Sequence, residues 1–322
     1  MRILVAMEVH EEHVRWIEEA AQGHEVVYWP VKGLVSASVS EEELAKADVI
    51  IGNVVPAQLR HARRLRWLQL SSAGADAYCK DGVMPAGAAL TNATGAFGLA
   101  IAEHMTALVF AMMKKLYRYY DNQKNADWHD EGQVESVYGK TVLVIGFGDL
   151  GRQFGKRMKA MGAHVVGMRR RSGDVPTEAD EMGTMDRLDE YLAKADIVAS
   201  CLPNTAETYH LYTKERFDAM KKGAYFINVG RGSNVVQDDL CAAVRSGQLA
   251  GAAVDVTEPE PLPADSPMWR TPGLYVTPHV SGGYHLQATH DNIVRIAAAN
   301  LRHFLAGEAL ENVVDFATGY KK

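Results

Sequence analysis

The sequence has few cysteines, no long hydrophobic run and no concentration of basic residues. Its three cysteines, Cys79, Cys201 and Cys241, lie far apart among 322 residues, so a disulfide framework is not expected and a reducing compartment is. The most apolar helical stretch, residues 105–113, is well short of the roughly 20 residues that span a bilayer. Because Lys and Arg number 34 against 40 Asp and Glu, and no polybasic run occurs, nucleic acid is not an expected partner.

The amino-terminal stretch also lacks the features of a targeting signal. It reads MRILVAMEVHEEH, which reaches acidic residues within about ten positions and has no small-residue cleavage site. We therefore expect a cytoplasmic protein with no membrane partner. A content of 47% hydrophobic and 23% charged residues is typical of globular proteins, and 322 residues suit two domains.

Short apolar runs alternate with amphipathic ones over the first hundred residues. The pattern RILVA, EEHVRWIEEAA, HEVVYW, EEELAKA, DVIIGN, LRWLQLS and ALTNAT predicts a parallel sheet covered by helices on both faces. The next stretch, GAFGLAIAEHMTALVFAMMKKLYRYY, predicts one long apolar helix buried between domains or subunits. We interpret its methionines Met105, Met112 and Met113 as core residues.

A second alternating series begins at Lys140. The runs KTVLVIGFG, AHVVGM, ADIVASCLP, GAYFINVG, LAGAAVDV and GLYVTPH predict a doubly wound sheet of the size that binds a dinucleotide. The tail, HDNIVRIAAANLRHFLAGEALENVVD, predicts one more amphipathic helix. The pattern alone does not say which half of the chain this helix packs against.

A glycine motif follows the first strand of that series. Gly146, Gly148 and Gly151 form a G-x-G-x-x-G pattern between an apolar strand and an amphipathic helix with Leu150 on its apolar stripe. Such a turn lets the backbone approach a pyrophosphate, and the helix start offers N–H groups and a favourable dipole. The alternative is a tight turn without a ligand.

Basic residues end the next strand. Enzymes that prefer NAD usually present an acid about 20 residues past the glycines. Here Arg169 stands at or next to that position, followed by Arg170 and Arg171, and guanidinium groups match a 2′-phosphate. This pattern favours NADP(H), and the alternative is a solvated basic turn.

Three polar residues follow later strands of the same half. Arg231 follows YFINVG, Glu260 follows AAVDV, and His279 follows LYVTP. Because the carboxyl ends of parallel strands meet at one edge of a sheet, we expect the three to share a cleft. Arginine can bind a carboxylate and polarise a carbonyl, and a glutamate beside a histidine keeps it charged for proton donation. Taken singly, each residue could also have an ordinary structural role, such as a helix cap or a surface group.

These stretches together resemble the D-isomer-specific 2-hydroxyacid dehydrogenases. The likeness is to the glyoxylate/hydroxypyruvate reductase-like and phosphoglycerate dehydrogenase-related members, and it runs from LSSAGAD through GKTVLVIGFGDLG, MKKGAYFINVGRGSNVV and LAGAAVDVTEPEPLP to YVTPHVSGG. It implies that Arg231 binds the substrate carboxyl and carbonyl groups, that His279 donates a proton, and that Glu260 rather than Glu258 is its partner.

The resemblance also implies further contacts. Backbone amides of Ser72, Ala73 and Gly74 would hold the substrate carboxylate, and Asp255 would contact the nicotinamide carboxamide. The expected cofactor-binding residues are Gly146, Gly148, Asp149, Leu150, Gly151, Arg169, Arg170, Cys201, Leu202, Pro203, Thr208, Val229, Gly230 and Asp255. No metal ligand is expected.

The implied fold is α/β, with two doubly wound parallel-sheet domains. A Rossmann cofactor domain, residues 99–287, would be inserted into a flavodoxin-like substrate domain, residues 1–98 and 288–322, with hinges near Gly98 and residue 288. The resemblance further implies a homodimer and the reduction of a small 2-oxo acid to a D-2-hydroxy acid, with NADPH favoured over NADH. The alternative function is an NAD(P)-sensing, corepressor-like binding protein of the same fold. Neither the identity of the acid nor the physiological direction follows from the sequence.

Overall fold

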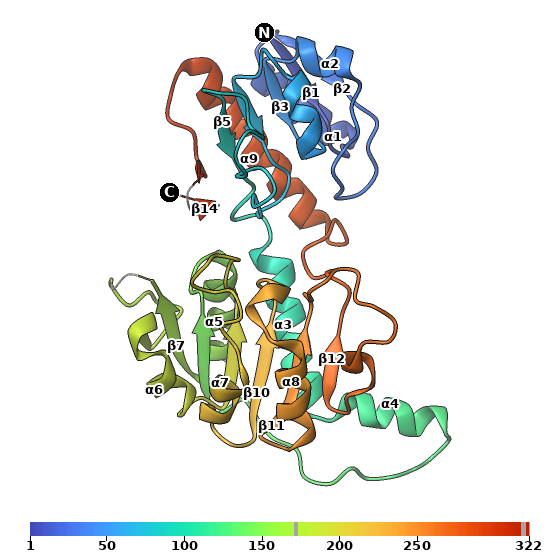
Figure 1. The fold of residues 1–322 in the computed structure, drawn as a ribbon, viewed down its shortest axis with the longest axis vertical. Helices are drawn as coiled ribbons and strands as arrows, with labels where there is room; N and C mark the ends of the chain where they lie inside the picture. Colours follow the sequence, from blue (N-terminus) through green and yellow to red (C-terminus); the bar gives the residue numbers. More distant parts are fainter. Residues whose placement is uncertain (171–172, 317–319, 322) are drawn as a thin grey trace. The chain divides into compact units, whose positions relative to one another are not determined.

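The computed structural model describes residues 1–170, 173–316 and 320–321, and the chain divides into two compact units (Figure 1). Unit 1 comprises Met1–Phe97 and Gly282–Lys322, and unit 2 comprises Gly98–Ser281. The chain therefore leaves unit 1 once and returns to it near its carboxyl terminus. Among the described residues, none of the helices combines the length and the apolar character that crossing a bilayer requires.

Unit 1 is built around a parallel sheet with the strand order β2-β1-β3-β4-β5, which is the flavodoxin-like order. Its elements are β1 (Arg2–Val5), α1 (Glu11–Ala21), β2 (Glu25–Tyr28), α2 (Glu41–Lys46), β3 (Val49–Ile51), a 3₁₀ helix (Pro56–His61), β4 (Trp67–Gln69), β5 (Ala89–Thr91), α9 (Gln287–Ala306), β13 (Val314–Asp315) and β14 (Tyr320–Lys321). The last two strands form a separate antiparallel pair.

The carboxyl-terminal helix α9 belongs to unit 1, which the sequence pattern did not settle. It packs along α1, and its Phe304 ring stacks on the buried Trp67 ring of β4 with 5.2 Å between centroids. The Trp67 indole N–H donates to Thr91 Oγ1 at 2.8 Å, so this large side chain is buried without an unsatisfied donor. Strands β1, β3 and β4 are buried, as expected for a parallel sheet covered on both faces.

Unit 2 contains a second parallel sheet with the order β12-β11-β10-β9-β6-β7-β8, which extends the Rossmann order by one strand. Its elements are α3 (Gly98–Met113), α4 (Leu116–Lys124), β6 (Thr141–Ile145), α5 (Asp149–Ala160), β7 (His164–Arg169), β8 (Glu181–Thr184), a 3₁₀ helix (Met185–Arg187), α6 (Leu188–Leu192), β9 (Ile197–Ser200), α7 (Lys214–Ala219), β10 (Ala224–Asn228), a 3₁₀ helix (Gly232–Asn234), α8 (Gln237–Arg245), β11 (Leu249–Val254), a 3₁₀ helix (Pro267–Arg270) and β12 (Leu274–Val276). The doubly wound prediction is confirmed, although β8 was missed because its sequence, EMGT, has no apolar run.

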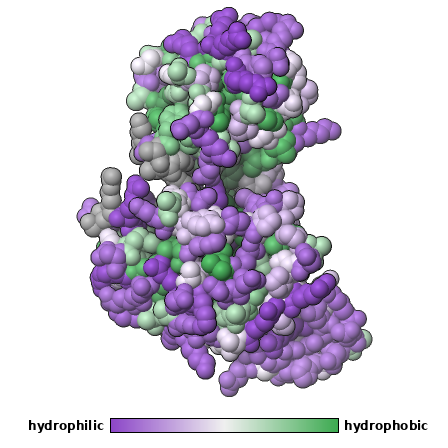
Figure 2. Space-filling model, viewed as in Figure 1, coloured by the Kyte–Doolittle hydropathy of each residue, from purple (hydrophilic) through white to green (hydrophobic). Residues whose placement is uncertain are grey.

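The prediction of a single long helix after Gly98 is wrong. The helix breaks at Lys115, whose φ of +57° lies in the left-handed region, and the chain continues as α4. Helix α3 packs against α5 and β11 within unit 2, with the predicted core methionines buried. Helix α4 buries no residue, and α4 with the segment after it forms a largely hydrophilic corner at the lower right of Figure 2.

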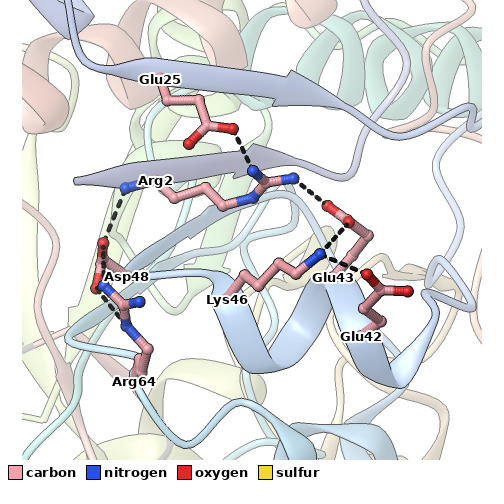
Figure 3. A network of polar contacts seen from close by, with 7 residues as sticks. All are labelled: Arg2, Glu25, Glu42, Glu43, Lys46, Asp48 and Arg64. Atoms are coloured by element: carbon pink, nitrogen blue, oxygen red, sulfur yellow. Dashed lines mark hydrogen bonds and ion pairs between the residues drawn. The ribbon is translucent and has the colours of Figure 1, made fainter.

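A polar network joins the amino-terminal ends of the unit 1 strands (Figure 3). Arg2 bridges Glu25 of β2 and Glu43 of α2, and the Arg2 backbone N–H donates to the Asp48 carboxylate at 2.8 Å. Arg64 donates to the same carboxylate at 3.0 Å. Burial acts to raise the pKa of Asp48, but these donors outweigh it and lower the pKa below its usual value. Ionised Asp48, which directly precedes β3, therefore joins the start of β1 to the segment before β4.

We predict that Asp48→Asn lowers the free energy of unfolding by about 1–3 kcal/mol, because the neutral amide has one acceptor oxygen and no charge for the donors of Arg2 and Arg64. A lowered pKa contributes stability that is present above the unfolded pKa of about 3.9 and is lost as pH falls through the folded value. The difference from wild type, measured by chemical unfolding, should therefore be full at pH 7 and shrink in acid. The exposed Asp81→Asn is the control. Equal stability of the two variants at pH 7 would contradict this role.

Candidate active site

The predicted glycine turn lies between β6 and α5, and its three glycines differ in the space around them. Gly146 has φ +90°, and a Cβ there would stand 2.8 Å from the Cys201 carbonyl oxygen. A Cβ at Gly151 would stand 2.5 Å from the Gly146 oxygen. At Gly148, which caps α5, a Cβ would point into open space. The turn thus needs glycine at Gly146 and Gly151 for packing, whereas Gly148 leaves room beside the helix amino terminus for an anion.

The arginines at the end of β7 adjoin this turn. Arg169 Nε donates to the Phe147 carbonyl oxygen at 2.9 Å, which fixes the side chain next to the glycines. Arg170 is exposed, and Arg171 lies outside the described residues. The Asp149 carboxylate lies at the first turn of α5 beside Gly98, and Leu150 is half-buried. The positive end of the helix dipole stabilises an acidic group at this position.

The predicted adenine-side segment forms a closed loop after β9. Burial raises the pKa of the Cys201 thiol to about 12, so this cysteine is a packed, protonated group. Leu202 is buried beside it. The Pro203 carbonyl accepts from Thr208 Oγ1 at 2.6 Å and from Asn234 Nδ2 at 3.0 Å. The Thr208 hydroxyl therefore shapes the loop itself.

Two buried asparagines fix the turn that carries Arg231. Asn228 Nδ2 donates to the Arg231 carbonyl oxygen at 2.8 Å, and Asn228 Oδ1 accepts from the Gly230 N–H at 3.1 Å. Asn234 Oδ1 accepts from the Arg231 N–H at 3.2 Å. A Cβ at Gly230 would stand 2.3 Å from the Leu202 oxygen, so the chain after Val229 passes tightly against the neighbouring loop. The sequence analysis missed both asparagines, although they flank Arg231 symmetrically at three residues on either side.

The buried Asp255 carboxylate holds the turn that carries His279. Oδ1 accepts from Thr277 Oγ1 at 2.6 Å and from the Val280 N–H at 3.0 Å. Oδ2 accepts from the N–H of Ser281 at 3.1 Å and from its hydroxyl at 2.5 Å. His104 of α3 adds a contact from Nε2 to Thr277 Oγ1 at 3.2 Å. This supporting role was not apparent from the sequence, because the donors lie more than twenty residues beyond Asp255.

His279 and Glu260 form a hydrogen-bonded pair. His279 Nδ1 lies 2.8 Å from Glu260 Oε2, while Glu260 Oε1 accepts from the Thr257 N–H at 3.0 Å. Glu258, the other glutamate of the EPEP stretch, lies 3.7 Å from His210 instead. His279 has φ +51°, an uncommon conformation for a non-glycine residue that the Asp255 contacts on both sides hold in place.

The charges around this pair favour a protonated imidazole. The hydrogen bond to Glu260 raises the pKa of His279, against an opposing effect of burial and of the Arg231 charge. Burial acts to raise the pKa of Glu260, but the bonds from His279 and Thr257 outweigh it and lower the pKa, with help from Arg231. The structure thus brings Arg231, Glu260 and His279 within one electrostatic environment, on the loops after β10, β11 and β12.

The predicted substrate loop lies in unit 1, after β4. Ser72 Oγ donates to the Gly74 oxygen at 2.8 Å, Asn92 Nδ2 donates to the Ala73 oxygen at 2.7 Å, and the Ala93 N–H donates to the Ser72 oxygen at 2.9 Å. All three loop carbonyls are therefore engaged. The loop is therefore held by contacts within unit 1.

Comparison with known proteins identifies the family of this chain. Residues 106–281 match the family model described as the NAD binding domain of D-isomer specific 2-hydroxyacid dehydrogenase. A glyoxylate/hydroxypyruvate reductase B from Pectobacterium carotovorum is 31% identical over 86% of this chain and 88% of its own length.

Solved structures of the same kind cover nearly the whole chain. A D-isomer specific 2-hydroxyacid dehydrogenase family protein from Aeromonas salmonicida is 32% identical and superposes with a TM-score of 0.85 over 98% of this chain and 99% of its own. An NADPH-dependent glyoxylate/hydroxypyruvate reductase from Sinorhizobium meliloti, solved with NADP and sulfate, is 26% identical with a TM-score of 0.81 over 99% of each chain. These relatives favour the enzyme over the corepressor-like alternative. The chain belongs to the D-isomer specific 2-hydroxyacid dehydrogenases, which use a nicotinamide cofactor.

Proposed function

We propose that this protein reduces a small 2-oxo acid to the D-2-hydroxy acid with NADPH. Unit 2 would bind the cofactor, and unit 1 would contribute the substrate loop of Ser72, Ala73 and Gly74. The observation that carries the proposal is the His279–Glu260 hydrogen bond of 2.8 Å beside the charge of Arg231. The names of the relatives, which include glyoxylate/hydroxypyruvate reductases, support a substrate of this class.

The residues around the glycine turn fit a dinucleotide. Gly146, Gly148 and the start of α5 would hold the pyrophosphate, the loop of Cys201, Leu202 and Pro203 would line the adenine side, and Asp255 would lie near the nicotinamide. When bound, the nicotinamide supplies a hydride to the keto carbon. Arg169, fixed against the Phe147 carbonyl, and exposed Arg170 would contact the 2′-phosphate, because no acid occupies the end of β7 to accept ribose hydroxyl bonds.

The polar residues then have distinct tasks. Arg231 would bind the substrate carboxylate and stabilise the charge that develops on the carbonyl oxygen. Because Nδ1 of His279 is engaged by Glu260, Nε2 is the nitrogen that would donate its proton to that oxygen. Donation leaves a neutral imidazole, which is reprotonated from solvent because the side chain is 53% exposed.

We also propose that the enzyme is a homodimer that uses α4 and the segment after it. Large side chains are exposed there, with Tyr120 at 57%, Trp128 at 104% and Tyr138 at 79%. Aromatic side chains of this kind are enriched in interfaces between protein chains.

The role of Arg231 predicts a large loss in Arg231→Ala. We expect kcat/KM for the 2-oxo acid to fall at least about 100-fold, because both carboxylate binding and oxyanion stabilisation are lost. The binding of NADPH, measured separately by fluorescence titration, should change little. Arg270→Ala, which removes an exposed arginine of the same unit, serves as the control. Wild-type turnover in the Arg231 variant would reject the assignment.

The role of Glu260 predicts a shifted pH profile. Reduction needs protonated His279, so its rate falls as pH rises through the pKa of that residue. Glu260→Gln removes the main cause of the raised pKa, and we expect the alkaline limb of the kcat/KM profile to move to lower pH. Glu258→Gln, two residues away, should leave the limb in place. If both variants keep the wild-type profile, Glu260 only positions the ring.

The role of Arg169 predicts a change in cofactor choice. In Arg169→Asp the KM for NADPH should rise by about 10–100-fold, the range expected when charge-assisted hydrogen bonds are lost, while the KM for NADH changes much less. Initial rates with each cofactor at a saturating 2-oxo acid give both values. An equal rise for the two cofactors would show that the arginine supports the turn rather than the 2′-phosphate.

A further inference from the structure

Three histidines meet in unit 1, outside the candidate active site. His10 precedes α1, His13 lies in the first turn of α1, and His290 lies in the first turn of α9. Each offers one ring nitrogen, and these three atoms all lie within 4.8 Å of one another. No metal ligand was expected from the sequence, where about 280 residues separate His10 and His13 from His290.

In two of the rings a hydrogen bond at Nε2 leaves Nδ1 as an acceptor. His290 Nε2 lies 2.8 Å from the Glu8 carbonyl oxygen, which can only accept, so this nitrogen carries the proton. His13 Nε2 lies 2.9 Å from Asp291 Oδ1, which also accepts from Gln287 Nε2. Nδ1 of each ring therefore presents a lone pair. Metal-binding histidines commonly use a carbonyl or carboxylate in this way to fix their tautomer.

Packing fixes the two buried rings. His290 stacks on Tyr284 with 4.0 Å between centroids and 6° between planes, and His13 packs on Trp16. The His13 and His290 centroids are 4.4 Å apart. His10 is the exposed member, with centroids 5.2 Å from His13 and 5.0 Å from His290. Two ligands are thus preorganised, and the third can adjust from the surface.

We propose that His10, His13 and His290 bind one divalent transition-metal ion, for which Zn²⁺ is the appropriate probe. Three imidazoles suit Zn²⁺ and its neighbours, whereas Mg²⁺ and Ca²⁺ need oxygen ligands. Zn–N bonds of about 2.1 Å place ligand nitrogens about 3.4 Å apart, so binding draws the rings together. The exposed side of His10 leaves a fourth position for water.

A metal here would compete with hydrogen bonds at the start of α1, where the His10 side chain accepts from the His13 backbone N–H. The His10 backbone N–H donates to His13 Nδ1 over 3.4 Å, a long bond at the start of α1. In return the ion joins the turn after β1 to the first turn of α9, next to the segment through which the chain re-enters unit 1. Because the ligands come together only in the folded chain, bound metal stabilises the folded state.

The test is to measure Zn²⁺ binding to the full chain directly. The protein is prepared without a polyhistidine tag and is freed of metal by a chelator. Isothermal titration should show one tight site per chain, and Zn²⁺ but not Mg²⁺ should raise Tm. His10→Gln should abolish this site without disturbing the core. Asp291→Asn should weaken it by about 10–100-fold through the loss of the carboxylate behind His13. His129→Gln, at an exposed histidine of unit 2, should bind as wild type.

Substitution with Co²⁺ gives a second readout, since nitrogen coordination produces visible absorption bands that His10→Gln should remove. Equal Zn²⁺ affinity in His10→Gln and His129→Gln, or no binding to the wild-type chain, would overturn the proposal. The three rings would then serve only in packing and in capping α1. These readouts do not involve turnover, so they are independent of the proposed reaction.

Discussion

The Asp255 carboxylate makes the interaction on which the candidate active site depends. It accepts four hydrogen bonds from Thr277, Val280 and Ser281, and the loop so held includes His279 in a left-handed conformation. A neutral amide in its place would offer these four donors one acceptor oxygen instead of two. The loop in turn sets the ring of His279 against Glu260. On the neighbouring loop, buried Asn228 and Asn234 hold Arg231 by hydrogen bonds to its backbone.

Both halves of the fold could be predicted because parallel strands leave a clear pattern in sequence. Runs such as RILV and TVLVI are buried on both faces and alternate with amphipathic helices, and this pattern led to the two doubly wound sheets. The errors arose where the pattern was weak or was overridden. The strand β8 has no apolar run, and the helix after Gly98 breaks at Lys115, where the sequence MMKKL contains no glycine or proline to mark the turn.

The site was predictable only where local sequence carries the chemistry. Gly146, Gly148 and Gly151 lie within six residues, and Arg231, Glu260 and His279 each follow an apolar strand. The groups that hold these residues depend on contacts across the fold, and they were missed. His104 approaches Thr277 from 173 residues away, and His290 meets His13 from another helix. Residues so far apart in the chain have no fixed sequence spacing, so no sequence motif identifies these contacts.

In the proposed reaction, the positive side chain of Arg231 and the proton donor His279 act together on a 2-oxo acid. The most direct measurement is the loss of NADPH absorbance with glyoxylate and hydroxypyruvate, compared with matched aldehydes that lack the carboxylate. We expect turnover of at least one acid and none of its aldehyde counterpart, since the aldehyde gives Arg231 no carboxylate to bind. Tight NADPH binding without turnover of any 2-oxo acid, or equal turnover of acid and aldehyde, would contradict it.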